Sequence, residues 1–304
     1  MISYHQPLAK TEAAVDAQQP GTNRTPSWRK RASTAIAKSR AAGKYLGTGP
    51  DWSEIKDVFV RLQQGKCGFC EKRLEDGDLE LHENVGAYEQ DVEHFRPKKA
   101  VDDWQPHADL GFPVNCGNPA GYFALAYDLR NYLISCKTCN SKFKRNGFPI
   151  EGTQGKSNAT DVANLNSKEQ PLLVNPVDSQ DVDPAKILTF QCVMPCPVAG
   201  DGRNRRRAQV VIQFFRLATR ESLIRERFDK MTNIWRAFKD LSSANATEQT
   251  AAARDLKAWQ ADSAPHASMA RAFVNLLTEA PQRAFQLYEA SRRYCEENTW
   301  QPPA

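Results

Sequence analysis

Two cysteine pairs with the same internal spacing constrain the fold of this 304-residue chain more than any other feature. Cys67 and Cys70 form the first pair, and Cys136 and Cys139 form the second. Two residues between paired cysteines let one tight turn present both sulfur atoms to a single ion, and two such turns complete a tetrahedral zinc shell. The pairs are too far apart for a zinc ribbon, so we expect the zinc to join both ends of an inserted module. Four thiolates leave no open position for a substrate, so we expect this zinc to be structural.

The rest of the sequence indicates the compartment in which these cysteines work. The first residues lack the apolar block of a signal peptide, and no run approaches the about 18 apolar residues of a membrane span. We therefore expect a cytoplasmic protein with no membrane partner, in which paired cysteines indicate a metal or redox site rather than disulfides. A redox pair would need a βαβ setting, which the pattern does not predict. Cys192 and Cys196 have ligand-like spacing but no second pair, and small buried or free thiols are favoured for them and for the isolated Cys116 and Cys295.

The distribution of apolar and polar residues divides the chain into four segments. Residues 1–50 are rich in Ala, Gln, Thr, Pro and Ser, which predicts a basic, partly flexible N-terminal arm that is helical in part over 28–43. Residues 51–150 contain both cysteine pairs and predict the main domain. Residues 151–204 predict a linker and an extended cover segment. Residues 205–304 carry apolar side chains at three-and-four spacing, which predicts a helical C-terminal region.

Local signals predict the elements of the main domain. A capping box and apolar residues at helical spacing predict a helix over 51–64. Short extended runs are expected at 91–95 and 132–134, each next to a cysteine pair or a basic segment. Between them, a proline at its start and apolar residues on one face predict a helix over 119–129. Residues 140–145 are expected to begin another helix. Residues 79–90 are ambiguous and are interpreted as an insertion.

Basic residues are clustered although the net charge is only +5. The first cluster contains no acid and comprises Arg24, Arg29, Lys30, Arg31, Lys38, Arg40 and Lys44. The second comprises Arg203, Arg205, Arg206 and Arg207. Such clusters are typical of proteins that bind a polyanion, and a solvated tail or helix start is the alternative interpretation.

The module between the cysteine pairs contains the best candidate for chemistry. Glu93 and His94 lie in a strand-like run directly before basic residues. A hydrolytic nuclease needs an oxygen-ligated divalent ion and a base that activates water. Glu93 meets the first need, and His94 meets the second because imidazole titrates near the working pH. The residues expected to hold flanking phosphates are Arg96, Lys98 and Lys99.

Three motifs together resemble the HNH endonuclease family, also called the ββα-metal or His-Me finger family. They are DVEHFRPK, the run that ends in NYLIS, and CKTCN with a lysine beyond it. The resemblance implies an α+β, mostly helical fold with a zinc-bound ββα-metal HNH core and a helical C-terminal region. By position, His94 matches the general base, Glu93 the acidic metal ligand, Asn131 the residue that orients the base, and Asn140 the last metal ligand. Lys142 and Lys144 are then further substrate-binding residues.

The implied metal chemistry differs from that of the cysteine site. Glu and Asn replace the Asp and His that the HNH family often has at these positions. Both variants keep an oxygen ligand, which suits Mg²⁺ or Mn²⁺ as the catalytic ion. The extra methylene of Glu93 leaves Asp91 open as the alternative ligand.

A narrower resemblance covers about residues 51–230. It includes KCGFCE, VEHFRPK and LLVNP, and it resembles the HNH subunits of prokaryotic anti-phage systems of the Septu type, which also occur beside some retrons. The resemblance implies an ATPase partner of ABC/SMC type and a nucleic-acid target, DNA or RNA. It is also compatible with a homodimer within a larger complex.

Two other function classes are weighed against an endonuclease. A non-catalytic, zinc-bound nucleic-acid-binding module accounts for the cysteines and arginines but leaves Glu93, His94, Asn131 and Asn140 as coincidences. A zinc nucleobase deaminase needs His or Cys two residues before its Glu and Pro before its later cysteine pair. Asp91 and Ser135 occupy those places, which argues against a deaminase. Metal-dependent cleavage of DNA or RNA would separate the endonuclease from the binding module.

Overall fold

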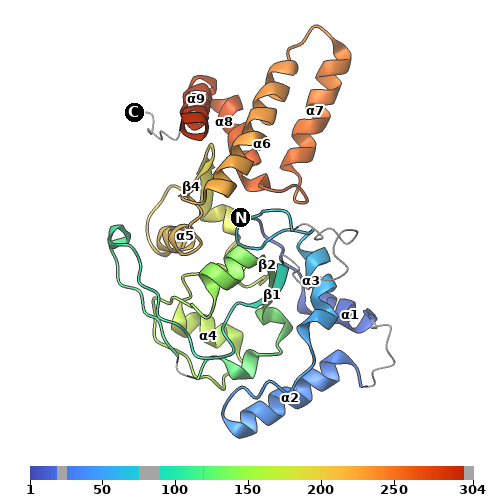
Figure 1. Cartoon of the computed structure of the whole chain (residues 1–304), viewed down its shortest axis with the longest axis vertical. Coiled ribbons are helices and arrows are strands. Elements are labelled where there is room, and N and C mark those ends of the chain that lie inside the picture. Colours follow the sequence, from blue (N-terminus) through green and yellow to red (C-terminus); the bar gives the residue numbers. More distant parts are fainter. Residues whose placement is uncertain (19–25, 75–89, 119, 298–304) are drawn as a thin grey trace. The chain divides into compact units, whose positions relative to one another are not determined.

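A computed structural model of the chain describes residues 1–18, 26–74, 90–118 and 120–297 (Figure 1). The backbone divides into two compact units. The N-terminal unit comprises Ser3–Phe69 and Leu74–Val182, and the C-terminal unit comprises Met1–Ile2, Cys70–Arg73 and Asp183–Ala304. Arg24 and nearly all of the expected insertion at 79–90 lie outside the described residues.

Two helices begin the N-terminal unit, α1 (Leu8–Ala17) and α2 (Trp28–Ala42). The buried residues of α2 are Trp28, Ala32, Ala35 and Ser39, which recur at helical spacing and form one stripe. The helix expected over 28–43 within the predicted N-terminal arm is confirmed by α2, and α1 is a further helix in this segment. Small side chains around Trp28 let α2 lie close to the rest of the unit.

The predicted capping box begins the next helix. The Asp51 side chain accepts a hydrogen bond from the Ser53 amide at 2.9 Å, and the Glu54 carboxylate accepts one from the Asp51 amide at 3.3 Å. The 3-10 turn η1 (Trp52–Ile55) then continues into α3 (Lys56–Leu62). The helix predicted over 51–64 is therefore confirmed.

A two-stranded antiparallel sheet lies at the centre of the N-terminal unit. Strand β1 (Gln90–His94) pairs with β2 (Tyr132–Cys136), and His94 lies opposite Tyr132. Every residue of β2 is buried, and the strand leads directly into the π-helical turn η5 (Thr138–Lys144). Both predicted extended runs and the helical turn after the second cysteine pair are confirmed. The mostly helical α+β class is also confirmed (Figure 1).

The segment between the two strands differs from its prediction. The helix predicted over 119–129 is wrong, because the chain forms short 3-10 turns instead. These turns are η2 (Ala108–Leu110), η3 (Phe123–Leu125) and η4 (Leu129–Asn131). Gly121 has a positive φ of 62°, and the Asp128 side chain caps a new turn by accepting from the Arg130 amide at 2.9 Å, so a continuous helix is interrupted twice. The apolar residues that predicted a helix face are still buried.

The expected linker over 151–204 contains regular structure. Helix α4 (Val162–Glu169) begins at Asp161, whose side chain accepts from the Asn164 amide, and its last residue, Glu169, is fully buried. Further along, β3 (Leu188–Gln191) pairs with β4 (Met194–Pro197) in the C-terminal unit, after the turn η6 (Pro184–Lys186). Some of the polar side chains that suggest an exposed linker, such as Glu169, are hydrogen-bond partners inside the N-terminal unit.

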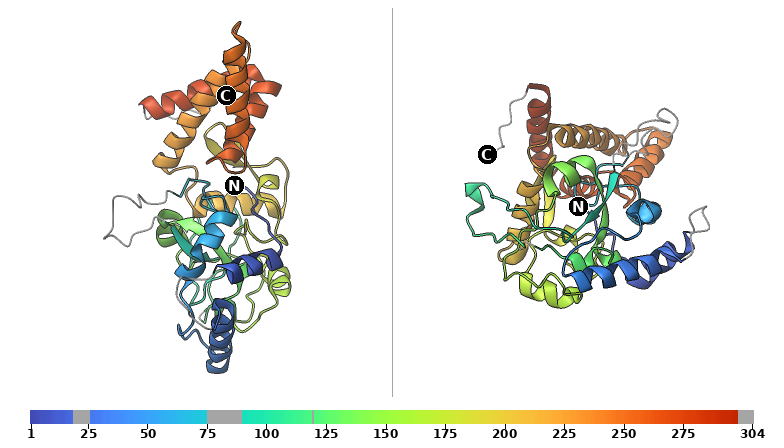
Figure 2. Two further views of the ribbon diagram at one scale, coloured as in Figure 1. Left: turned by 90° about the vertical axis from the view of Figure 1, so that its right-hand side faces the viewer. Right: turned by 60° about the horizontal axis from the view of Figure 1, so that its bottom comes forward.

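The C-terminal unit is built from helices around the β3–β4 pair. They are α5 (Arg203–Phe214), α6 (Glu221–Asp240), α7 (Ala246–Gln260), α8 (Ala267–Glu279) and α9 (Pro281–Glu297). Helix α6 packs against α7, α8 and α9, and α8 packs against β3; Figure 2 shows these helices from two further sides. Within the described residues, none of the helices combines the length and apolar character needed to cross a bilayer.

Candidate functional site

The four cysteines of the two pairs meet in the structure. Cys67, Cys70, Cys136 and Cys139 are all buried, and their sulfur atoms lie within 4.8 Å of one another. A zinc ion with Zn–S bonds of about 2.3 Å holds tetrahedral sulfur atoms roughly 3.8 Å apart, so a small inward movement would complete the shell. The donor set, its burial and its spacing therefore fit a zinc ion.

Backbone pairing brings the first cysteine pair to the second. The Gly68 amide donates to the Ile134 carbonyl at 3.0 Å, so the turn between the first two cysteines lies on β2. Gln63 at the end of α3 reinforces this contact, because its side chain donates to the Ile134 carbonyl at 2.8 Å and accepts from the Ile134 amide at 2.6 Å. A side chain at Gly68 would approach Leu133 to 2.8 Å, which explains why the smallest residue occupies the turn.

His94 ends β1 in an enclosed aromatic setting. Its ring is buried, with edge-to-face contacts to Trp52 at 4.9 Å and Tyr132 at 5.0 Å between centroids. The Nε2 atom lies 3.0 Å from the Ala126 carbonyl oxygen, which can only accept, so Nε2 carries the proton. Nδ1 is then the unprotonated nitrogen, and it faces the Lys98 ammonium at 3.5 Å. Burial, followed by the charge of Lys98, lowers the pKa of His94 well below its usual value.

Glu93 points away from solvent toward a lysine. Its carboxylate is buried and lies 3.3 Å from the Lys144 ammonium, which is also buried and donates to the His94 carbonyl at 3.4 Å. Burial raises the pKa of Glu93 to about 7, and the charge of Lys144 opposes that shift. Burial likewise lowers the pKa of Lys144. Lys144 therefore serves as the partner of Glu93, and this position does not favour its predicted contact with substrate.

Asp91 lies on the same face of β1 as Glu93, two residues away, but is more accessible. Its Oδ2 atom accepts a hydrogen bond from the Asn140 side chain at 3.0 Å, and its Oδ1 atom lies 2.7 Å from the Lys137 ammonium. The Asn140 and Asp91 side chains are thus neighbours at the start of η5, with the amide nitrogen of Asn140 facing the carboxylate. The structure therefore brings Asp91, the alternative carboxylate ligand, into contact with Asn140, the predicted last ligand, which the sequence alone did not indicate.

Asn131 has no free side-chain group for substrate. Its Oδ1 atom accepts from the Arg96 amide at 2.7 Å, and its Nδ2 atom donates to the carbonyls of Arg96 at 3.0 Å and Leu125 at 3.1 Å. The Phe95 amide donates in turn to the Asn131 carbonyl at 2.8 Å. Asn131 therefore joins the loop after His94 to the turn that supplies the Ala126 carbonyl. Its role in orienting a base stays a prediction.

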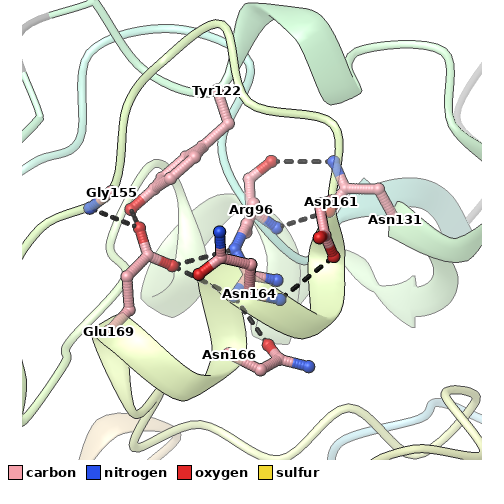
Figure 3. Close-up of polar contacts among 8 residues, drawn as sticks. All are labelled: Arg96, Tyr122, Asn131, Gly155, Asp161, Asn164, Asn166 and Glu169. Atoms are coloured by element: carbon pink, nitrogen blue, oxygen red, sulfur yellow. Dashed lines mark hydrogen bonds and ion pairs between the residues drawn. The ribbon is translucent and has the colours of Figure 1, made fainter.

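Arg96, a predicted phosphate contact, is buried, and Figure 3 shows the polar contacts of its side chain. Its guanidinium donates to Glu169 Oε2 from Nε at 3.1 Å and from Nη2 at 3.0 Å, and to Asn166 Oδ1 at 2.7 Å. The other oxygen of Glu169 accepts from the Tyr122 hydroxyl at 2.7 Å and the Gly155 amide at 2.9 Å. The charge of Arg96 is matched inside the unit by Glu169, so this position does not favour its predicted contact with phosphate.

The remaining predicted substrate contacts are reachable. Lys98 is partly exposed, and its ammonium lies 4.3 Å from the centroid of the Trp52 ring. Lys99 and Lys142 are exposed. Sequence reasoning missed Trp52 as a wall of the site and Glu169 as the partner of Arg96. The only sequence signal for Trp52 was its position directly after the capping residue Asp51. No sequence signal in α4 indicated that Glu169 pairs with Arg96.

Other candidate metal residues do not form a comparable cluster. Among the described residues, the four cysteines are the only group of three or more His, Cys, Asp or Glu side chains positioned to share an ion. Cys192 lies buried between β3 and β4, and Cys196 lies within β4. Neither belongs to such a group among the described residues, and their interpretation as small thiols stays a prediction.

Comparison with known proteins finds a relative over part of the chain. Septu protein PtuB from Bacillus mycoides (strain KBAB4) is 36% identical over 137 residues. The match covers 45% of this chain but only 38% of PtuB, so the chain spans well under half the length of this relative. No family model matches the chain, and no solved structure matches it. The resemblance to Septu proteins is thereby confirmed, whereas membership of the HNH endonucleases stays a prediction.

Proposed function

We propose that the chain is a metal-dependent HNH-type endonuclease that hydrolyses phosphodiester bonds. The observation that carries this proposal is the fixed tautomer of His94. Its Nε2 proton is held by the Ala126 carbonyl, so Nδ1 is the unprotonated nitrogen; it faces the Lys98 ammonium at 3.5 Å and would take a proton from a water that replaces Lys98 there. Asn131 holds both backbone segments that set this geometry.

A divalent ion completes the proposed chemistry. Mg²⁺ or Mn²⁺ prefers oxygen ligands, and Asp91, Glu93 and Asn140 supply them on one side of β1 and η5. Such an ion would neutralise charge on the phosphate and on the leaving oxygen. Asp91 with Asn140 is the more accessible pair, because Lys144 covers and neutralises Glu93. We therefore favour Asp91 over Glu93 as the first carboxylate ligand, with Lys98, Lys99 and Lys142 beside the phosphate.

The biological setting follows from the similarity to a Septu protein. That similarity supports a role in anti-phage defence. We extend it to an effector nuclease that works with an ABC/SMC-type ATPase partner, which would restrain cleavage until infection. Recovery of such an ATPase with the tagged full chain from its native host tests this extension, and a fully active chain without any partner would contradict it.

Replacement of His94 tests the catalytic proposal. Because the ring is buried between two aromatic side chains, His94→Gln is preferred to His94→Ala: glutamine keeps much of the volume and a donor for Ala126 but lacks the basic nitrogen. We expect His94→Gln to lower Mn²⁺-dependent cleavage of plasmid or total RNA by about 100-fold or more, the scale of general-base catalysis. The matched control is His107→Gln. His107 is an exposed histidine that caps η2, and this variant should cleave as the wild type does.

Two further variants choose between the carboxylate ligands. Asp91→Asn should raise the Mn²⁺ concentration needed for half-maximal cleavage if Asp91 binds the ion. Glu93→Gln should do so if Glu93 binds it. Wild-type chain that cleaves neither DNA nor RNA with Mg²⁺ or Mn²⁺, alone or with its ATPase, would contradict the nuclease proposal and favour the non-catalytic binding module.

A further inference from the structure

The Lys98 side chain covers the nitrogen of His94 on which the proposed chemistry depends. Its ammonium lies 3.5 Å from Nδ1, the ring nitrogen that carries no proton. An ammonium has donors and no acceptor, so Lys98 can share a hydrogen with this nitrogen but cannot receive one from it. The site therefore holds a cation in the place where a water must lie to give its proton to Nδ1.

Two aromatic rings hold the ammonium in this place. It lies 4.3 Å from the centroid of the Trp52 ring and 5.9 Å from that of the Tyr45 ring. Both distances are within the about 6 Å over which a ring face attracts a cation, and tryptophan is the strongest aromatic partner. Trp52 is itself fixed, because its ring stacks on Tyr127 and its Nε1 atom donates to the Tyr132 hydroxyl at 2.7 Å. Trp52 therefore sets where the ammonium lies.

The backbone on the N-terminal side of Lys98 is fixed, so its side chain is the part that can move. The Arg96 amide donates to the Asn131 side chain at 2.7 Å, and the Pro97 carbonyl accepts from the Tyr122 amide at 2.8 Å. Lys98 is partly exposed, and a lysine ammonium is carried on a flexible four-carbon stem. Rotation of this stem can turn the ammonium away from His94 without a change in the backbone.

A phosphate is a better partner for Lys98 than the groups that it contacts in the structure. The Trp52 ring and the imidazole are both neutral. Burial lowers the pKa of Lys98, the charge of Glu93 opposes this shift, and the charges of Lys99 and Lys144 add to it. A hydrogen bond between two charged groups is about twice as strong as one between neutral groups. A phosphate beside the site would therefore draw the ammonium toward itself.

We propose that Lys98 is a substrate-operated cover of the base: Trp52 holds it over His94, and a phosphate of the nucleic acid draws it away and uncovers Nδ1. A water then enters beside Nδ1 and gives it one proton, and the hydroxide oxygen attacks phosphorus as the bond to the leaving oxygen breaks. Trp52 is a positioning residue, because it acts through Lys98. The inference rests on the proposed function and adds how that site is regulated.

The NMR signal of His94 Nδ1 tests the proposal without any cleavage. The full chain is labelled with ¹⁵N-histidine and observed without divalent ion at about pH 8, where imidazole is neutral, and His94→Gln assigns the signal. Lys98→Met keeps the apolar stem and removes the ammonium, so we expect it to move the signal downfield. Trp52→Phe, a weaker ring for a cation, should move it part of the way. Lys99→Met removes the neighbouring exposed charge and should leave the signal in place.

Oligonucleotides then test whether phosphate moves the cover. Short DNA and RNA oligonucleotides are added separately, and at least one should move the wild-type signal downfield and that of Lys98→Met much less. The same oligonucleotides with uncharged methylphosphonate linkages should not move the wild-type signal. A wild-type signal already at the position of Lys98→Met, or one that neither charged oligonucleotide moves, would overturn the proposal.

Kinetics separate a mobile cover from a fixed group that acts only in the transition state. A cover that leaves the base and then holds phosphate predicts that Lys98→Met raises KM about tenfold or more, the scale of one hydrogen bond between charged groups, with kcat within about threefold. A large loss of kcat at unchanged KM would contradict the cover. If the signals move as expected but the wild type never cleaves, only the nuclease proposal fails.

Discussion

Gly121 lies where the chain turns back onto the loop that follows His94. Its φ of +62° belongs to the left-handed region, and an added Cβ would lie 2.0 Å from the Lys99 carbonyl oxygen. The next amide, that of Tyr122, donates to the Pro97 carbonyl at 2.8 Å. The close approach of two backbone segments at this point is therefore possible only with glycine.

Substitution of Gly121 should reveal this packing. Gly121→Ala combines left-handed strain of about 1–2 kcal/mol with a clash against backbone, so we expect a loss of about 3 kcal/mol or more in the free energy of unfolding. Gly111→Ala is the matched control, because Gly111 has a φ of +73° and no atom within 4 Å of an added Cβ. It should lose only the strain, about 1 kcal/mol. Urea unfolding measures both, and equal losses would contradict the clash.

At the scale of elements, α4 is joined to the loop after β1 by a buried ion pair. The side chains of Arg96 and Glu169 are 3% and 0% exposed, and the Glu169 oxygen that does not face Arg96 accepts two further hydrogen bonds, from Tyr122 and Gly155. A buried ion pair is weak support for stability by itself, but breaking one partner leaves an uncompensated charge. This asymmetry leads to the next prediction.

Removal of one partner should cost more than removal of both. We expect Glu169→Ala to destabilise the chain by about 3–5 kcal/mol, and Arg96→Met with Glu169→Leu to be less harmful than the two single changes added together. Asp255→Ala breaks the exposed pair with Arg254 and should cost less than about 1 kcal/mol. A double-mutant cycle monitored by urea unfolding measures the coupling, and additive losses would contradict it.

In the C-terminal unit, a buried histidine joins α6 to the start of α8. His266 precedes α8, and its Nε2 atom lies 3.0 Å from Glu226 Oε2. Burial lowers the pKa of His266, and the hydrogen bond to Glu226 opposes that shift. Burial raises the pKa of Glu226, but the hydrogen bond from His266 and the charge of Lys72 outweigh it and lower the pKa overall. We interpret the pair as a neutral imidazole that donates to a carboxylate.

These shifts predict a loss of stability in mild acid. In the unfolded chain the imidazole takes up a proton near pH 6.5, whereas the folded unit keeps it neutral to lower pH. The unfolded state then binds more protons, so the free energy of unfolding falls as the pH falls from about 7 to 5. His266 has a positive φ of 53°, which asparagine tolerates, so His266→Asn should fold and remove part of this slope in thermal melts. An unchanged slope in His266→Asn would contradict the assignment.

At the scale of the whole molecule, the four cysteines join segments that are far apart in the sequence. Metal binding that occurs only in the folded state adds its free energy to folding. We expect one zinc ion per chain and a large drop in melting temperature when it is removed by a chelator. Cys136→Ser should lose the zinc and the stability together, whereas Cys116→Ser, at a half-exposed cysteine outside the cluster, should keep both. Measured zinc content near one per chain in Cys136→Ser would contradict the assignment.

Elements that depend on neighbouring residues could be predicted from the sequence, and those that depend on distant ones could not. The capping box at Asp51 and the run that became β1 were predicted because their signals are local. The helix over 119–129 was predicted wrongly because apolar spacing alone does not reveal the backbone reversal at Gly121. Residues 151–170 were interpreted as a linker because polar side chains suggest solvent, whereas Glu169 is a buried partner of Arg96.

The sequence by itself determined the four cysteines of the candidate zinc site and the identity of the candidate base, because fixed covalent spacing and residue chemistry suffice for both. Only the tertiary structure decided the tautomer of His94, the partner of Glu93 and the burial of Arg96. Each of these depends on a group from a distant segment: the Ala126 carbonyl, the Lys144 ammonium and the Glu169 carboxylate. The physical reason is that a charge or proton is placed by the groups that surround it after folding, and burial sets which of them it meets.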